Sequence, residues 1–251
     1  MTAVLPGRTA AVTEQDVRTA LGTVVDPELD EPITDVGFVR SVAVDGAAVE
    51  VHLRLPTSFC APNFAWLMVS DAHDAVSGVP GVQRVVVELD DHSDSDLINA
   101  GLAAGLGYRG TFGHEAEESL DALRATFQRK AHTAAMERAL TALLRTDPAA
   151  DPTAVTLGDL PADDAAALRR RRAAVGLPVD DAAPVLVHDD GSRPGPEQAP
   201  MVLRRARSVR ISVDGNAHFC RGLLTTRYPG SGTDQAPRPE DRPLLPLEVR
   251  P

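Results

Sequence analysis

Cysteine is scarce in this sequence, since only Cys60 and Cys220 occur among its 251 residues. Two cysteines cannot build a disulfide framework, and we expect both to be reduced thiols. Apolar runs are short as well: none approaches the roughly eighteen residues of a membrane-spanning helix, and the N-terminus lacks a basic region followed by an apolar one. The sequence therefore predicts a cytoplasmic protein without a membrane span or a secretory signal.

Positive charge is scarce in the first part of the chain. Residues 1–110 hold six basic and sixteen acidic residues, a net charge of −10, whereas residues 111–251 hold nineteen basic and twenty acidic residues. Nucleic-acid binding needs an electropositive face, because the phosphates of the ligand are negative. The arginine run at 169–172 ends a predicted helix that begins with acids, which suits the helix dipole. We therefore expect no nucleic-acid partner.

The motifs of several large enzyme classes are absent. The sequence has no G-x-S-x-G, no H-E-x-x-H and no P-loop. The string "GLGYRG" at 105–110 does match G-x-G-x-x-G, but the dinucleotide fingerprint also needs a strand directly before it and a βαβ frame. The residues before this string predict a helix instead, so we interpret it as part of a linker.

Residues 13–90 carry the patterns of an α+β layer. Apolar spacing predicts a short helix after Thr13, which the prolines of "DPELDEP" (26–32) end. The runs "VRSVAV" and "VEVHLRL" alternate on either side of Asp45-Gly46, a pattern typical of a hairpin with one covered face. A longer helix follows Cys60, and "VQRVVVEL" supplies a third strand. The order α-β-β-α-β predicts a small sheet with helices on one face.

Cys60 lies between the end of a predicted strand and the start of a predicted helix, just before Pro62, which suits a first helical turn. The unpaired N–H groups and the positive dipole end of that helix favour thiolate over thiol. Position alone leaves two interpretations open. The thiol is either a reactive or metal-ligating group, or a half-buried side chain that serves as a small hydrophobe.

Several short motifs follow one another in a fixed order between residues 13 and 102. They are Asp26-Pro27-Glu28, Asp35-Val36-Gly37-Phe38-Val39, Thr57 and Cys60, with a weaker correspondence at His92 and Asn99. Together they resemble the SufT/PaaD-like family of iron–sulfur assembly factors, which includes the cytosolic iron–sulfur targeting subunit of eukaryotes. The resemblance covers about two-fifths of the chain. It departs at one point, where Ala61 separates Cys60 from the proline and lengthens the turn by one residue.

The resemblance implies an accessory factor that assembles iron or iron–sulfur centres, or delivers them to a client metalloenzyme, and is not itself an enzyme. Cys60 would be a transient ligand of iron or a cluster, because soft thiolates suit iron in clusters. Other assembly proteins are expected partners. A bacterial oxygenase is an expected client, since the resembling phenylacetate-pathway members serve one. One cysteine per domain makes a homodimer that shares a cluster attractive on stoichiometric grounds.

Asp26 and Glu28 have two interpretations. In one, their carboxylates lie beside Cys60 as hard metal ligands or proton acceptors. In the other, they are turn and cap residues, since Asp-Pro favours turns. The sequence leaves both open.

The rest of the chain predicts a different organisation. We expect domain 1–90, a linker at 91–114, a domain of helices and a β-hairpin at 115–228 that recognises the client, and a proline-rich tail at 229–251. Helices are expected at about 115–145 and 162–174, and the hairpin at 208–228. His218 and Cys220 lie two apart, so on a strand they share a face, which predicts a second pair of metal ligands. No family is recognised for residues 115–251.

Two other classes of function remain. A metal-free adaptor or chaperone for an oxygenase component would tolerate Cys60→Ala, whereas a metal carrier would not. A thiol enzyme would need a histidine base beside Cys60, and His52, His73 and His92 are the nearby candidates in sequence.

Overall fold

The computed structural model describes residues 11–113 and 120–231. These residues form two compact units. Among the described residues, the first unit comprises residues 11–24, 32–107 and 220–231, and the second comprises residues 25–31, 108–113 and 120–219. The polypeptide therefore passes between the units more than once. Nearly all of the expected proline-rich tail, from residue 232 onward, lies outside the described residues.

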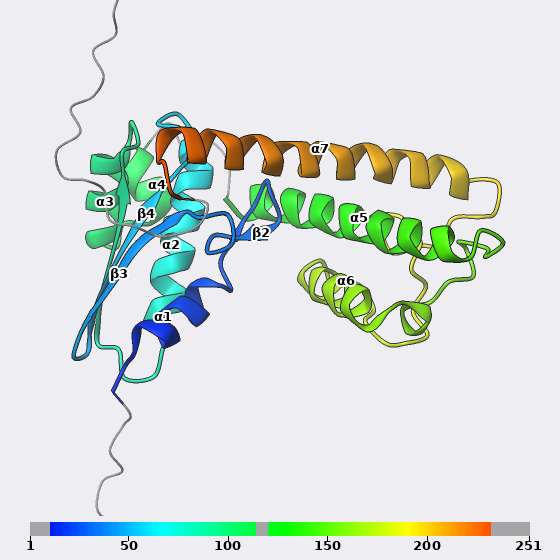
Figure 1. The fold of residues 1–251 in the computed structure, drawn as a ribbon, viewed down its shortest axis with the longest axis horizontal. Helices are drawn as coiled ribbons and strands as arrows, with labels where there is room; N and C mark the ends of the chain where they lie inside the picture. Colours follow the sequence, from blue (N-terminus) through cyan, green and yellow to red (C-terminus); the bar gives the residue numbers. More distant parts are fainter. Residues whose placement is uncertain (1–10, 114–119, 232–251) are drawn as a thin grey trace, which may run out of the picture. The chain divides into compact units, whose positions relative to one another are not determined.

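The first unit contains the predicted α-β-β-α-β order and confirms the α+β class (Figure 1). Its elements are α1 (Glu14–Leu21), β3 (Val39–Asp45), β4 (Ala48–Arg54), α2 (Pro62–Ser77) and β5 (Arg84–Asp90). The sheet order is β3-β4-β5, with an antiparallel pair at β3-β4 and a parallel pair at β4-β5. Helix α2 is thus the crossover connection that parallel strands need.

Alternation along β4 separates an apolar from a polar side of the sheet. Val49, Val51 and Leu53 are buried, while Glu50 is exposed and His52 is half-buried. Helices α1 and α2 pack against the sheet. Gly46 has a φ of +59° in the turn between β3 and β4, which confirms the hairpin and explains the glycine.

The segment 91–114, expected to be a linker, contains two helices, α3 (Ser95–Ala103) and α4 (Gly107–Phe112). Ile98 of α3 is fully buried, and α3 contacts β5. The glycine- and aspartate-rich composition concealed this packing, because a short helix needs only a few apolar side chains to dock. Two further strands, β1 (Val25–Asp26) and β2 (Glu31–Pro32), pair as a two-stranded sheet within the "DPELDEP" segment.

The second unit is built mainly from α5 (Leu120–Thr146), α6 (Ala162–Ala174) and α7 (Ala199–Arg227), with the short 3-10 helix η2 (Leu157–Asp159) between α5 and α6. Helix α6 has the predicted bounds. The core includes Met136 and Leu140 of α5, Leu168 of α6 and Val185 of the following segment. Near the end of α6, Arg172 is buried and donates to the carbonyl oxygens of Pro184 (2.5 Å) and Val185 (2.9 Å), so it is more than a surface cation at a helix end.

The hairpin expected at 208–228 is wrong, because these residues belong to the continuous helix α7. Its buried positions are spaced seven, four and seven residues apart, which is helical spacing: Ala206, Val213, Ala217 and Leu224. The alternation at 209–213 and the "DGN" string imitated strand and turn over a few residues. Packing over the full length of the helix outweighs that local signal.

Ion pairs connect α5 with α7 in the second unit, where Figure 1 shows the two helices side by side. Arg138 of α5 contacts Asp214 of α7 at 2.7 Å, and Arg210 of α7 contacts the buried Glu137 of α5. No helix among the residues that the structure describes is long and apolar enough to cross a membrane.

Candidate functional site

Cys60 lies in the loop that joins β4 to α2. The hydroxyl oxygen of Thr57 is 3.4 Å from the Cys60 sulfur and accepts a hydrogen bond from the Phe59 backbone N–H at 3.2 Å. Cys60 is half-buried, whereas the ring-bearing Phe59 beside it is 83% exposed. The loop therefore presents a thiol next to an exposed aromatic side chain.

The extra residue Ala61 is the N-cap of α2, and Pro62 begins the helix. Ala61 supplies no side-chain oxygen to the first N–H groups of the helix. The thiol thus lies one residue before the N-cap of a helix that has no side-chain cap, which is the environment that the sequence predicted.

His92 holds this loop through a hydrogen bond to its backbone. Its Nε2 donates to the Cys60 carbonyl oxygen at 2.8 Å, and its Nδ1 accepts from the Asp94 backbone N–H at 3.1 Å. The Ser93 N–H also donates to the Ser58 carbonyl at 2.9 Å. Because both ring nitrogens of the buried His92 are engaged with backbone groups, this histidine positions the loop and does not face the sulfur.

Asn99 of α3 has a similar positioning role. Its side-chain oxygen accepts from the Leu89 N–H at 2.9 Å, and its side-chain nitrogen donates to the Leu89 carbonyl at 3.2 Å. Leu89 belongs to β5, an edge strand whose outer backbone groups need partners. The Asn99 side chain therefore satisfies the backbone N–H and carbonyl of Leu89 on this edge strand, next to the loop that contains His92.

The C-terminal end of α7 reaches the same loops within the first unit. Arg227 donates to the Leu55 carbonyl at 3.2 Å and to the Asp91 carbonyl, while the Tyr228 hydroxyl donates to the Asp91 carboxylate at 3.0 Å. Burial raises the pKa of Tyr228 to about 12. The Arg54 guanidinium lies over the Tyr228 ring, 5.1 Å from its centroid. No sequence signal could identify Arg227 and Tyr228, which are far from these loops along the chain.

Asp26 and Glu28 belong to the second unit, whereas Cys60 belongs to the first. The Asp26 carboxylate accepts from the N–H groups of Glu28 (2.8 Å) and Leu29 (2.9 Å), as expected of a turn residue. Burial raises the pKa of Asp26 to about 6. Glu28 accepts from the Asn216 side chain at 3.2 Å. Within their own unit, both carboxylates act as turn and packing residues.

His218 and Cys220 lie on helix α7 and not on a strand. Residues two positions apart in the sequence of a helix are about 200° apart around its axis, so the side chains of His218 and Cys220 point to different sides of α7. The geometric reason for expecting a second metal-ligand pair is therefore lost.

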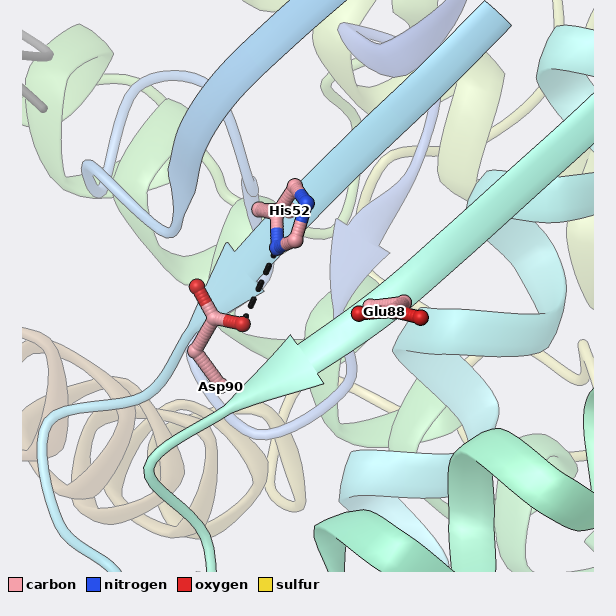
Figure 2. Close-up of side chains that lie close together, drawn as sticks. All are labelled: His52, Glu88 and Asp90. Carbon is pink, nitrogen blue, oxygen red and sulfur yellow. Dashed lines mark hydrogen bonds and ion pairs between the residues drawn. The ribbon is translucent and has the colours of Figure 1, made fainter.

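A group that the sequence did not reveal lies on the polar side of the sheet. Figure 2 shows His52 of β4 with Glu88 and Asp90 of β5. One potential ligand atom of each residue lies within 4.8 Å of the others, and His52 Nδ1 is 3.0 Å from Asp90 Oδ1. Strand alternation predicts that each residue faces the polar side, but only the β4-β5 register brings them together.

Known proteins resemble the first part of this chain. Residues 14–89 match the profile of a family described as iron-sulfur cluster assembly protein. An uncharacterised protein of Methanocaldococcus jannaschii is 37% identical over 89 residues, which are 35% of this chain and 92% of that protein. No solved structure matches the chain.

Two further relatives are much longer than the matched region. The iron-sulfur cluster carrier protein of Mycobacterium leprae is 36% identical over 88 residues, which are 35% of this chain and 22% of that protein. The chloroplastic Fe-S cluster assembly factor HCF101 of Arabidopsis thaliana is 28% identical over 97 residues, 39% of this chain and 18% of that protein. This chain thus spans about a fifth of the length of these two proteins.

The matched residues contain both the small sheet and the Cys60 loop. The alignment with the Methanocaldococcus jannaschii protein also covers 92% of that protein. Through residues 14–89, the chain belongs to the iron-sulfur cluster assembly protein family.

Proposed function

We propose that this protein carries iron or an iron–sulfur cluster transiently and passes it to a client metalloenzyme, with Cys60 as the ligand. The observation that supports this role is the placement of Cys60: a half-buried thiol on a fixed loop, inside the region that matches the family. The relatives named as carriers are consistent with a carrier function.

One thiolate cannot hold a cluster alone, because iron–sulfur clusters take about four protein ligands. The remaining ligands would come from a second copy of the chain, from an assembly partner or from small thiols. Such incomplete coordination favours transfer, since fewer protein bonds must break when the client takes the cargo. The Thr57 hydroxyl can donate a hydrogen bond to the thiolate, a type of contact that adjusts cluster potential.

The client would dock on the surface that presents Cys60. Phe59 is a large exposed apolar side chain beside the thiol, and aromatic residues are enriched at protein interfaces. The family resemblance leads us to propose an oxygenase as client, whereas the names of the relatives identify no client. In this proposal the protein acts in the cytoplasm and does not catalyse a reaction of its own.

A thiol enzyme is a weaker candidate on geometric grounds. A catalytic histidine must lie within hydrogen-bond reach of the sulfur whose proton it removes. His92 instead donates to the carbonyl oxygen of Cys60, and its other nitrogen is occupied by the Asp94 N–H. A metal-free adaptor stays the principal alternative.

The test is the amount of iron and acid-labile sulfide per chain after anaerobic reconstitution of the wild type, Cys60→Ala and Cys220→Ala. We expect the wild type and Cys220→Ala to retain iron and Cys60→Ala to lose it. Equal iron in all three proteins would show that Cys60 is not a ligand. Near-zero iron in all three would leave the adaptor as the function.

A further inference from the structure

We propose that the polar side of the sheet binds a first-row divalent cation through His52, Glu88 and Asp90. This site is separate from Cys60 and does not depend on the proposed carrier function. It lies wholly within the first unit, on two adjacent parallel strands.

The strand register places the three side chains on one side of the sheet. His52 of β4 pairs directly with Glu88 of β5, and Asp90 is the next residue of β5 that points the same way. Neighbouring strands are only about 4.8 Å apart. The three side chains therefore converge without any loop having to close around the ion (Figure 2).

The distances suit a common metal ion. Zinc binds imidazole nitrogen and carboxylate oxygen at about 2.0–2.2 Å, so two such ligands of one ion lie about 3 Å from each other. His52 Nδ1 and Asp90 Oδ1 are 3.0 Å apart. Glu88 completes a set whose ligand atoms all lie within 4.8 Å, a range that a carboxylate rotation can shorten.

The atoms that face away from the proposed ion have partners of the kind found in metal sites. His52 Nε2 is 2.9 Å from the Glu50 carboxylate, and the second oxygen of Asp90 contacts Arg40. A metal-ligating histidine commonly donates its other N–H to a carboxylate, which leaves the opposite nitrogen free to bind the metal. Glu50 can hold His52 in that orientation, with the Nδ1 lone pair toward Asp90 and Glu88.

Charge and ligand type indicate which ion would bind. The carboxylates of Glu50, Glu88 and Asp90 with the guanidinium of Arg40 sum to −2, which a divalent cation balances. An imidazole with two carboxylates suits zinc, cobalt or ferrous iron better than soft cuprous copper. His52 is 25% and Asp90 14% exposed, so an ion could enter from solvent and keep water as a further ligand.

The competing explanation is an ion-paired histidine without a metal. In that state a protonated His52 would donate from both nitrogens, to Asp90 and to Glu50. The two explanations differ in whether Nδ1 can be taken by a metal ion.

Zinc titration of a metal-free full chain tests the proposal. The parent protein carries Cys60→Ala and Cys220→Ala, which removes both thiols as ligands and separates this result from the carrier experiment. We expect one saturable zinc site in this parent, measured by calorimetry. We expect affinity at least tenfold weaker in His52→Gln and in Glu88→Gln, and about tenfold weaker in Glu50→Gln, whose residue only orients His52.

His73→Gln is the matched control, because His73 is a histidine of α2 outside this group. It should bind zinc like the parent, and circular dichroism should show that every variant is folded. The proposal fails if the parent shows no saturable site, or if His52→Gln and Glu88→Gln bind as tightly as the parent. Either failure leaves the role of Cys60 as a cluster ligand untouched.

Discussion

At the scale of single residues, the candidate site depends on side chains that position the thiol without touching it. His92 is buried and satisfies the Cys60 carbonyl, and Asn99 satisfies both backbone groups of Leu89. Both are residues that the family resemblance indicated. Their contacts give them a physical role: they hold the Cys60 loop and the neighbouring loop in one arrangement.

His92→Ala should loosen the Cys60 loop. The change leaves the Cys60 carbonyl and the Asp94 N–H without their partner, and we expect the free energy of unfolding to fall by about 1–3 kcal/mol. Alkylation of Cys60 by iodoacetamide should become several-fold faster, because the loop opens more often. Denaturant unfolding and mass spectrometry measure the two effects.

His73→Ala serves as the control for His92→Ala, since His73 is a partly exposed histidine of α2. It should change neither quantity appreciably. A His92→Ala protein with unchanged stability and unchanged alkylation would contradict the positioning role.

At the scale of elements, α7 shows how packing overrides a local pattern. Its "DGN" string resembles a hairpin turn, yet Asp214 pairs with Arg210 one helical turn earlier and with Arg138 of α5. A carboxylate that joins two arginines stabilises the helix at the point where the sequence favoured a turn. The helical form also buries Val213 and Ala217 on one side.

Gly215→Ala should stabilise the protein by about 0.5–1 kcal/mol, because alanine has a better helix propensity than glycine. The space for a methyl group is present, since nothing lies within 4 Å of a Cβ at Gly215. Thermal unfolding measures the change. A hairpin turn at this glycine would predict destabilisation instead.

Gly46→Ala is the matched control, because its Cβ would also meet nothing within 4 Å. Gly46 has a φ of +59°, where alanine is strained by about 1–2 kcal/mol. The two substitutions should therefore shift stability in opposite directions. Destabilisation by both would argue against helix α7 at Gly215.

At the scale of the whole molecule, a buried histidine of the second unit makes the stability of the protein depend on pH. His132 of α5 in the second unit is 2% exposed, and its Nε2 has no hydrogen-bond partner among the described residues. Burial, with help from the charges of Arg172 and Arg171, lowers the pKa of His132 to about 4. Between pH 6.5, the ordinary pKa of histidine, and about pH 4, His132 is protonated in the unfolded chain but stays neutral in the folded chain.

His132 should therefore take stability from the second unit as the pH falls from about 6.5 to about 4, by up to about 1.4 kcal/mol per pH unit. Asp26 of the same unit, whose pKa is raised to about 6, should act in the opposite direction below pH 6, so the effect of His132 is isolated by substituting it. His132→Leu should remove this contribution, so the stability difference between variant and wild type should grow in favour of the variant as the pH falls. Urea unfolding at several pH values measures it. His218→Leu, an exposed position on α7, is the control. A difference that is independent of pH would refute the prediction.

The sequence alone determined the α-β-β-α-β order, the turn at Asp45-Gly46, helix α6 and the position of Cys60 before α2. Those features depend on short-range physics: period-2 alternation, the backbone freedom of glycine and the rigidity of proline act within a few residues. The family resemblance was readable for the same reason, because its motifs are short and follow a fixed order.

The tertiary structure decided the rest. It made α7 a helix, buried Arg172 against two carbonyls, brought Arg227 to the Cys60 loop and set His52 beside Glu88 and Asp90. Each of these depends on which distant segments pack together and in what register. Local residue patterns do not contain that information, since long-range contacts form only when the burial they bring exceeds the entropy lost in ordering the chain.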